Sequence, residues 1–401
     1  MKFLLKKYWI IAVLLILSSC DSDDKVYLTC DIFEQLEPKI SEDENGVFVN
    51  IIFDAEILLN DIESYGFTYN IVGEREKTTI EGANLSSSTL NLLINDIFIC
   101  GLEYEISGFI TLGDSICTSS KTTFSTEKSY VAPPWCTTVF DIATRGSNFI
   151  NGLSINGKSF ILTEYLYEIT NQPSLIQRES FPLNSNTGTN YASFSIGKFA
   201  YIKSTDTKDL YRYNSEENNW INLRSTGLPS FTRYFFGGQL NETGYLFNHI
   251  NSYQYDLENN TFVELASYQI PLIINKFQTN SAIYVINEDY EILEFNKSNG
   301  TWSYLTTYPG NKSNYVISFV SNNKAYIGLS YNYFSPGINY SDIYELDLNT
   351  ATWQKVVPFP TKLENSWTIG SAGNLDFGYM FYSKNGKTVL WNFDYSKIVY
   401  E

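Results

Sequence analysis

The 401-residue chain is 43% hydrophobic and 18% charged, and its 44 acidic residues outnumber its 27 lysines and arginines, giving a formal net charge of -17. Aromatic residues make up 16% of the chain, a content that excludes a disordered polymer. The acidic balance argues against nucleic acid or anionic lipid as the main partner, because both require a cationic surface. A single histidine, His249, excludes sites that need several imidazoles, so we expect no metal site and no cofactor.

Residues 1–19 have the pattern of a signal peptide. Three lysines precede an apolar run over 9–17, which is shorter than the about 20 residues that a membrane-spanning helix needs. Leu17-Ser18-Ser19-Cys20 resembles the lipobox of bacterial lipoproteins, in which the cysteine becomes the lipid-modified first residue of the mature chain. The resemblance implies a lipid anchor at Cys20 in the outer membrane. The alternative is an ordinary cysteine after a simple signal peptide.

Residues 20–27 are expected to form an acidic tether. Asp21, Asp23 and Asp24 follow the lipobox cysteine directly. This run resembles the acidic tether that sends some Gram-negative lipoproteins to the cell surface, which implies a protein that faces outward. A solvated linker without a sorting role is the alternative.

Residues 28–130 carry short runs of alternating apolar and polar positions, which predict the strands of a small β-sandwich. The segments 63–69, 102–106 and 123–126 resemble fibronectin type III-like modules of bacterial surface lipoproteins. Such modules usually act as spacers, and the resemblance implies that role here. Residues 131–134 then form a stiff hinge, because the two prolines fix φ and donate no backbone hydrogen bond.

Four further cysteines, Cys30, Cys100, Cys117 and Cys136, are disulfide candidates in a compartment that permits oxidation. No pair has the spacing of a zinc site. We expect Cys100 to pair with Cys117, because the turn at residues 113–114 should bring the chain back. Cys30 and Cys136 would then join the two ends of the first domain. Reduced core cysteines are the alternative.

From Trp135 onward one sequence phrase recurs. A strand ends in an aromatic or apolar residue followed by Asn or Asp, and a large apolar residue, the anchor, stands six positions later. Asn and Asp side chains cap turns and tolerate the left-handed conformation, so each copy predicts a tight hairpin. The copies are Tyr213-Asn214 with Trp220, Tyr255-Asp256 with Phe262, Phe295-Asn296 with Trp302, Leu346-Asp347 with Trp353, and the degenerate Ile169-Thr170 with Ile176.

The repeat length predicts the architecture. The anchors, beginning with Trp135, lie 41, 44, 42, 40 and 51 residues apart, and repeats of this length with four short strands each indicate propeller blades. A second series, expected to pack between blades, comprises Tyr201, Tyr245, Tyr284, Tyr326 and Tyr379. The phrase resembles kelch and galactose-oxidase-like propellers, which close on a YD…W pattern, although the usual diglycine after the second strand is missing.

We therefore expect an all-β chain in which an Ig/Fn3-like sandwich precedes a six-bladed kelch-like β-propeller over 135–401. Trp135 lacks three preceding strands, and the last blade runs out at Glu401 before its fourth strand. The segment 135–140 should therefore supply the outer strand of the blade that the C-terminus builds, which removes an open sheet edge.

An aromatic residue preceded by a polar one stands about 14 residues after each anchor. The family resemblance implies that inner strands begin on the ligand-binding face, so this series should ring the channel mouth. Rings interleaved with amide and cationic groups suit sugars; packing between blades is the alternative. The candidates are Phe149, Tyr191, Arg233, Tyr234, Lys276, Phe277, Tyr315 and Trp367.

The blade between Tyr326 and Tyr344 is irregular, because it has 17 intervening residues where its sisters have fewer than a dozen. The insertion carries Tyr331 and Tyr333, together with Phe334 and Tyr340. Insertions in repeat proteins map to one face, often the binding face, so Tyr331 and Tyr333 are further ligand-binding candidates. Packing against the neighbouring domain is the alternative.

Catalytic residues are few. The copper centre of galactose oxidase requires a pair of histidines, which this chain lacks. Acid–base pairs could come from Asp206, Asp209, Glu288, Asp289 and Glu364, but carboxylates in polar turns are usually solvated. We therefore expect a surface-anchored, non-catalytic module that recognises a glycan or a surface protein. The alternatives are a metal-independent sugar epimerase or mutarotase, like some six-bladed kelch proteins, and an interaction subunit of an outer-membrane complex.

Overall fold

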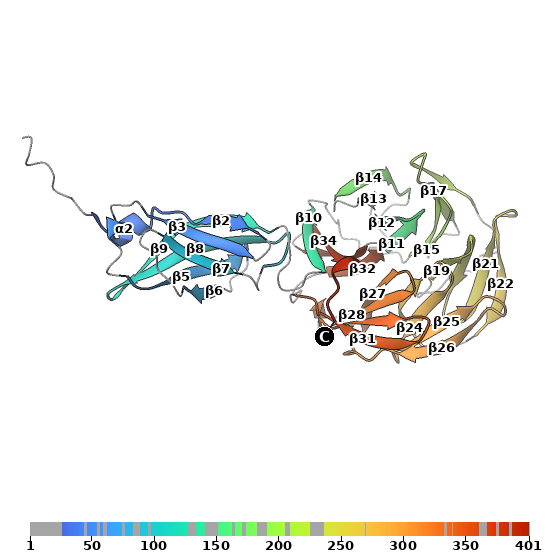
Figure 1. The fold of residues 1–401 in the computed structure, drawn as a ribbon. Helices are drawn as coiled ribbons and strands as arrows, with labels where there is room; N and C mark the ends of the chain where they lie inside the picture. Colours follow the sequence, from blue (N-terminus) through green and yellow to red (C-terminus); the bar gives the residue numbers. More distant parts are fainter. Residues whose placement is uncertain are drawn as a thin grey trace, which may run out of the picture. The chain divides into compact units, whose positions relative to one another are not determined.

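The structure is a computed structural model in which the chain separates into two compact units (Figure 1). Unit 1 comprises Met1–Asp96 and Glu103–Thr126, and unit 2 comprises Ile97–Leu102 and Glu127–Glu401. The residues described are 26–43, 46–53, 57–58, 62–73, 77–82, 89–94, 98–126, 134–140, 151–162, 165–170, 174–182, 191–204, 209–224, 236–268, 270–332, 335–338, 340–360, 367–373, 377–384 and 387–400. Within these residues no helix is long and apolar enough to cross a membrane.

Unit 1 is built from β-strands whose alternating side chains face a shared core. Its three-stranded sheet contains β2 (Lys39–Glu42), β3 (Val47–Ile52) and β7 (Thr89–Ile94), and its four-stranded sheet runs β6 (Thr78–Glu81), β5 (Ile62–Ile71), β8 (Glu103–Leu112), β9 (Ser115–Ser125). The short strands β1 (Val26–Tyr27) and β4 (Ile57–Leu58) pair in parallel, and α2 (Cys30–Phe33) is a single helical turn. A Cβ on Gly108 of β8 would lie 2.3 Å from Cδ1 of Ile51 on β3, so the two main sheets pack face to face.

Unit 2 consists, in the described residues, of six antiparallel sheets in chain order (Figure 1). Their strands are β11 (Asn151–Ile155), β12 (Lys158–Leu162), β13 (Tyr165–Ile169) and β14 (Leu175–Ser180) in sheet 1; β15 (Tyr191–Ile196), β16 (Phe199–Ser204), β17 (Leu210–Asn214) and β18 (Asn219–Asn222) in sheet 2; β19 (Phe236–Leu240), β20 (Thr243–Phe247), β21 (Asn251–Asp256) and β22 (Thr261–Ser267) in sheet 3; β23 (Ile273–Gln278), β24 (Ile283–Asn287), β25 (Glu291–Asn296) and β26 (Thr301–Thr307) in sheet 4; β27 (Tyr315–Ser321), β28 (Lys324–Asn332), β30 (Ile343–Asp347) and β31 (Thr352–Val356), with β29 (Ser335–Ile338) beside β28, in sheet 5; and β32 (Trp367–Gly373), β33 (Phe377–Lys384), β34 (Lys387–Asp394) and β10 (Trp135–Phe140) in sheet 6.

The six sheets surround a common axis as in a β-propeller. The first strand of each sheet lies toward the middle of unit 2 and the fourth toward its periphery (Figure 1). First strands contact one another in the cyclic order β11, β15, β19, β23, β27, β32 and back to β11. Six hydrophobic clusters fill the spaces, each shared by two successive sheets, and one of them joins sheet 6 to sheet 1.

The recurring phrase forms the hairpin from the third strand to the fourth, as the sequence predicts. Asn or Asp accepts the backbone N–H two residues ahead through Oδ1, which caps the turn. These hairpin turns begin at Asn214, Asp256, Asn296 and Asp347, with N···O distances of 3.1, 3.0, 3.0 and 2.9 Å. Asp394 makes the same contact, at 3.0 Å, at the start of the short helical turn Tyr395–Lys397 that ends sheet 6. The left-handed residue follows at Asn218, Asn260, Gly300 or Ala351.

The degenerate first copy was assigned one residue too late. In sheet 1, Ile169 pairs with Leu175 rather than with Ile176, because the turn is one residue shorter than in the sister sheets. Leu175 packs against the cluster that joins sheets 6 and 1, whereas the side chain of Ile176 is 43% exposed. Leu175 is therefore the anchor of sheet 1.

The pairing of 135–140 with the C-terminal sheet is confirmed. β10 lies antiparallel to β34, with Trp135 opposite Phe393 and Phe140 opposite Thr388, and forms the outer strand of sheet 6. Trp135 is fully buried; its ring centroid lies 4.9 Å from that of Phe393 and 4.8 Å from that of Phe359, which follows sheet 5. The first strand of unit 2 is thus locked between its last two sheets.

In sheets 1, 3, 4 and 5, an aromatic residue that follows the fourth strand contacts the anchor of the next sheet. Phe181, Tyr268 and Tyr308 contact the anchors of the following sheets, as Phe359 contacts Trp135. The ring centroids lie 4.9 Å apart for Phe181–Trp220, 6.3 Å for Tyr268–Trp302 and 5.8 Å for Tyr308–Trp353. The sequence analysis did not identify this series.

All four remaining cysteines form disulfides, but the expected pairing was wrong. Cys30 on α2 pairs with Cys117 on β9, and Cys100 pairs with Cys136 on β10. The β8–β9 hairpin places Cys117 opposite Ile110, whereas Cys100 precedes the far end of β8. About ten residues of extended strand, roughly 33 Å, separate Ile110 from Cys100, which no disulfide spans.

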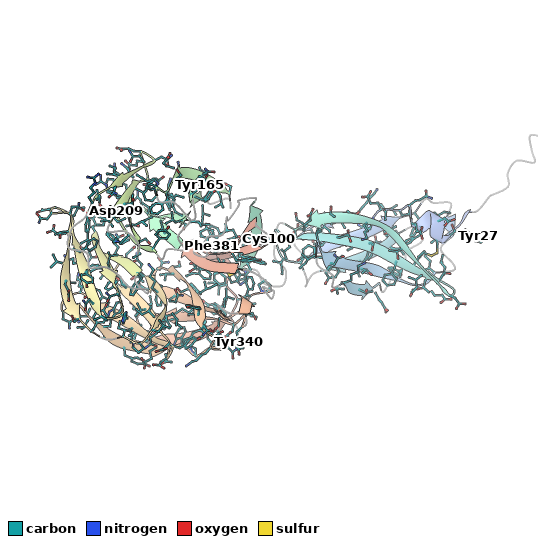
Figure 2. All side chains as sticks on the ribbon, turned by 180° about the vertical axis from the view of Figure 1, so that it is seen from behind. Tyr27, Cys100, Tyr165, Asp209, Tyr340 and Phe381 are labelled. Atoms are coloured by element: carbon teal, nitrogen blue, oxygen red, sulfur yellow. A yellow bond between two sulfur atoms is a disulfide. The ribbon has the colours of Figure 1, made fainter. Side chains whose placement is uncertain are left out.

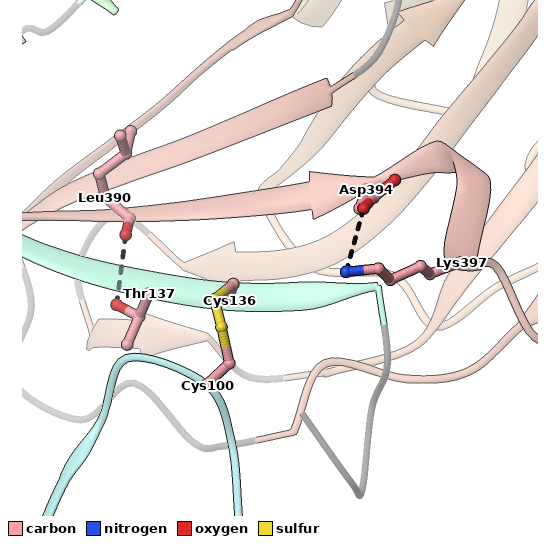
Figure 3. The surroundings of a disulfide bond; sticks show 6 residues. All are labelled: Cys100, Cys136, Thr137, Leu390, Asp394 and Lys397. Atoms are coloured by element: carbon pink, nitrogen blue, oxygen red, sulfur yellow. Dashed lines mark hydrogen bonds and ion pairs between the residues drawn. A yellow bond between two sulfur atoms is a disulfide. The ribbon is translucent and has the colours of Figure 1, made fainter. Parts of the chain in front are cut away.

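The Cys100–Cys136 disulfide fastens the segment 97–102 to the outer edge of sheet 6. Figure 3 shows this bond beside the Thr137–Leu390 hydrogen bond that ties β10 to β34. The Thr137 backbone N–H donates to Cys100 O at 3.0 Å, and Ile99 enters the cluster between sheets 5 and 6. The segment therefore covers a strand edge that would otherwise be open.

We expect Trp135→Ala to destabilise unit 2 by about 3–5 kcal/mol, because it empties the space that one large ring fills between sheets 5 and 6. Ile221→Ala, at a 44% exposed position on β18, should change stability by less than about 0.5 kcal/mol. Urea unfolding followed by tryptophan fluorescence measures both. Equal effects of the two substitutions would refute closure through β10.

Removing the Cys100–Cys136 disulfide by a double Cys→Ser substitution should lower the stability of unit 2 by about 2–4 kcal/mol. The six tryptophans beyond residue 19 all lie within 127–401, so fluorescence reports on unit 2. The matched Cys30→Ser, Cys117→Ser variant should leave the fluorescence midpoint unchanged. A larger midpoint shift from this control than from the first variant would contradict the assignment.

Candidate functional site

The site is a central cavity of about 730 Å³ in unit 2. Its lining comes from the first strands of all six sheets, including Gly152 to Ser154 of β11, Ser193 to Ser195 of β15, Gly237 of β19, Ile274 to Gln278 of β23, Val316 to Val320 of β27 and Gly370 to Gly373 of β32. Because each sheet contributes its inner strand, no single repeat can form this cavity alone.

Small polar groups dominate the described lining. Hydroxyls come from Ser154, Ser193, Ser195, Ser318 and Ser371, and amides from Asn275, Gln278, Asn280, Asn322 and Asn323. Glycines on three of the six inner strands, β11, β19 and β32, add exposed backbone. Among the described residues that line the cavity, Lys276 has the only ionisable side chain.

Neighbouring inner strands approach closely at the axis. A Cβ on Gly152 of β11 would lie 1.9 Å from Ser371 O on β32, and one on Gly237 of β19 would lie 2.4 Å from Ser193 O on β15. Any larger residue at these glycines would push the strands apart. The absence of side chains there also leaves the cavity wide.

Side-chain hydrogen bonds then fix the inner strands in register. Asn275 Nδ2 donates to Val316 O at 2.8 Å and to Ser318 Oγ at 3.0 Å, joining sheet 4 to sheet 5. Lys276 Nζ donates to Gly237 O at 2.8 Å, joining sheet 4 to sheet 3. Ser195 Oγ donates to Ser154 O across sheets 2 and 1. The polar lining is thus held in place before any ligand arrives.

Lys276 differs from the ion-paired lysines of the described residues because no carboxylate lies beside its ammonium group. Its ammonium lies 6.0 Å from the Phe236 ring centroid, and no carboxylate is among the described residues of the lining. Burial disfavours the charged form and lowers the pKa of Lys276 to about 8. By contrast, Lys158 and Lys324 each form an ion pair with a buried glutamate, Glu168 and Glu345.

Two described members of the aromatic series predicted to surround the channel mouth do not line the cavity. Tyr191 and Tyr315 begin β15 and β27, but neither is among the residues that line the cavity. The Tyr191 ring packs 5.4 Å from that of Phe181, and Tyr315 borders the cluster between sheets 4 and 5. Both occupy the packing position that the sequence analysis held as the alternative.

Lys276 and Phe277 do line the cavity, because they lie deeper along their strand. Only five residues separate β22 from β23. A residue about 14 positions after the anchor therefore falls in the middle of the inner strand in sheet 4, whereas in sheets 2 and 5 it falls at the start of that strand. Phe277 pairs with Tyr284 and is equivalent to Phe194 and Phe319, not to Tyr191. The predicted series is therefore not one structural position.

The remaining candidates cannot be placed as side chains. Phe149, Arg233, Tyr234, Tyr333 and Cys20 lie outside the described residues, as do the side chains of Tyr331 on β28 and Trp367 on β32. The insertion forms a short hairpin in which β29 pairs with β28. Tyr340, after this hairpin, is 42% exposed and lies at the edge of unit 2, whereas Phe381 is buried inside it (Figure 2).

None of the described carboxylates considered for acid–base chemistry lines the cavity. Asp209, Glu288 and Asp289 are described but absent from its lining, and Asp206 and Glu364 lie outside the described residues. His249 lies in the turn between β20 and β21, where its backbone oxygen accepts the Ile270 N–H at 3.1 Å. In the described part of the chain, no group of three His, Cys, Asp or Glu side chains could hold a metal ion.

Sequence reasoning missed the small residues that line the axis, although a signal for them exists. They stand eight residues before the buried aromatic of each second strand, and that aromatic is Phe160 in sheet 1. The missed positions are Gly152, Ser193, Gly237, Ser318 and Ser371, and Lys276, already a candidate, holds the same position in β23. Counting back from the tyrosine series, instead of forward from the anchors, would have found them, because strand pairing fixes that distance.

Comparison with known protein families gives no match, and comparison with curated proteins gives none either. Among solved structures, the chain is similar to YjhT, with 12% identity over 65% of this chain and 99% of that chain and a TM-score of 0.48. It is also similar to YCF48 bound to D1 peptide, with 10% identity over 65% of this chain and 97% of that chain and a TM-score of 0.43. A third is an auxiliary nutrient binding protein from Bacteroides thetaiotaomicron, with 10% identity over 92% of this chain and 98% of that chain and a TM-score of 0.42.

Proposed function

We propose that this chain is a non-catalytic binding protein that captures a saccharide in the central cavity of unit 2. The observation that carries the proposal is the lining: hydroxyl, amide and backbone groups from six strands converge on one cavity. Saccharides offer many hydroxyls that take directional hydrogen bonds, and such a lining supplies both donors and acceptors.

The size of the cavity favours a small ligand over a protein partner. Ligand pockets occupy about 300–1,000 Å³, and the observed volume of about 730 Å³ falls within that range. A stable protein interface instead buries about 1,200–2,000 Å² of surface. A saccharide is therefore the preferred ligand, and recognition of a surface protein is the second possibility.

Binding is favoured over catalysis for a chemical reason. A sugar epimerase or mutarotase moves protons and needs an acid and a base beside its substrate. The described lining supplies a single lysine and no carboxylate. The enzyme alternative thus lacks the groups it needs in this part of the cavity.

We further propose that 135–401 forms a complete six-bladed kelch-like propeller carried by a fibronectin type III-like spacer. Residues 1–19 would be removed, and Cys20 would carry the lipid that anchors the protein in the outer membrane. The acidic tether 20–27 would lead it to the cell surface. The lipobox, the acidic run and the strand pattern of the sequence support this arrangement.

Filling the cavity should abolish binding without unfolding the protein. Ser154 is exposed and lines the cavity, so Ser154→Phe adds a ring there without opening the core. Ser303→Phe places the same ring on exposed β26, away from the cavity. On a glycan array followed by calorimetry, we expect Ser154→Phe to weaken saccharide binding at least about tenfold and Ser303→Phe to leave it unchanged.

Two results would reject this site. One is equal affinity of the Ser154→Phe and Ser303→Phe variants for the bound glycan, which would place binding elsewhere. The other is no binding of any saccharide at millimolar concentration. Tryptophan fluorescence of each variant shows that unit 2 remains folded.

A further inference from the structure

Lys276 breaks the pattern of the position that it occupies. The equivalent residues of the other five inner strands are all glycine or serine, namely Gly152, Ser193, Gly237, Ser318 and Ser371. Each pairs with the residue that follows the buried aromatic of the second strand, as Lys276 pairs with Val285. The repeat itself therefore calls for a small residue, and a long cationic side chain needs a separate explanation.

Packing explains the small residues but not the lysine. Gly152 and Gly237 have no room for a Cβ against the neighbouring strand. Lys276 instead reaches across to Gly237 O, an acceptor that a neutral donor would satisfy equally well. An ammonium offers three N–H donors, and Gly237 O is the one acceptor found for them among the described residues.

The charge of Lys276 also stands alone. Lys121, Lys158, Lys198 and Lys324 each have a glutamate within 2.7 Å or less. The strands packed around Lys276 from sheets 3 and 5, and the described cavity wall from sheets 1, 2 and 6, bring no ionisable side chain to it. Desolvation without a counter-charge is costly, and an anionic ligand would offset that cost.

We propose that Lys276 binds the carboxylate of an acidic saccharide, such as a uronic acid, inside the cavity. The inference rests on the proposed saccharide-binding function and narrows its ligand class. The ligand carboxylate would accept hydrogen bonds from the ammonium, while the hydroxyls of Ser154 and Ser371, which line the same cavity, would meet sugar hydroxyls.

The test uses acidic oligosaccharides paired with their carboxyl-reduced, neutral counterparts, so that ligand shape is kept while charge is removed. For the wild-type protein we expect at least about tenfold tighter binding of one acidic member than of its neutral partner. Lys276→Met should bind both members equally, at the affinity of the neutral one. Lys276→Arg, which keeps the charge, should retain part of the preference.

The pH dependence supplies a second readout that needs no variant. A uronic acid stays ionised across neutral and alkaline pH, whereas Lys276 loses its proton above its pKa of about 8. Wild-type affinity for the acidic ligand should be constant below pH 7 and fall above pH 8 until it reaches the affinity of the neutral partner. Affinity for the neutral partner should not follow this curve.

The outcomes separate the two proposals. Equal binding of acidic and neutral partners by the wild type would overturn the role of Lys276 and leave saccharide binding intact. Absence of binding to every saccharide would overturn both. If Lys276→Met fails to fold, the wild-type pH series decides, and a flat profile for the acidic ligand counts against the proposal.

Discussion

Packing of aromatic side chains between successive sheets is the interaction on which the structure of unit 2 depends. Each hairpin places a large anchor opposite an aromatic or aliphatic residue of the third strand, and the spaces between sheets become shared cores. The first and last sheets would each have one face without a packing partner unless these two sheets also packed against each other. Trp135, on the first strand of unit 2, helps to close the structure, because its side chain is buried among side chains of the last two sheets, 5 and 6.

The cavity follows from the same packing. Wedging large side chains between the outer parts of the sheets draws the inner strands together, until backbone oxygens stand where a Cβ would be. Glycine is then required for steric reasons at Gly152 and Gly237. Their small size leaves a polar cavity whose wall is mostly backbone and hydroxyl groups. The cavity is thus a consequence of closure, although the turns after β23 and β27 also contribute to its lining.

One residue differs in charge from the rest of the described cavity wall. Lys276 both joins β23 to β19 and places a positive charge in a cavity whose described wall is otherwise neutral. In a chain with a net charge of -17, long-range electrostatics oppose the approach of an anion. A local cation is what could offset that repulsion inside the cavity.

The sequence by itself determined the repeat and the capped turns, because hairpin chemistry and strand alternation act within a few residues. The pairing of 135–140 with the last sheet followed from counting the repeats, which left one outer strand missing. The sequence did not determine which residues line the axis. The predicted ring of Tyr191 and Tyr315 packs between sheets, and the register that brings Lys276 to the cavity depends on a short connection before β23. The disulfide partners were also decided by tertiary structure, since Cys100 and Cys136 are 36 residues apart in the sequence and meet where the segment that holds Cys100 lies beside β10. Local pattern fixes hairpins, but contacts between distant strands exist only once the sheets have closed around a common axis.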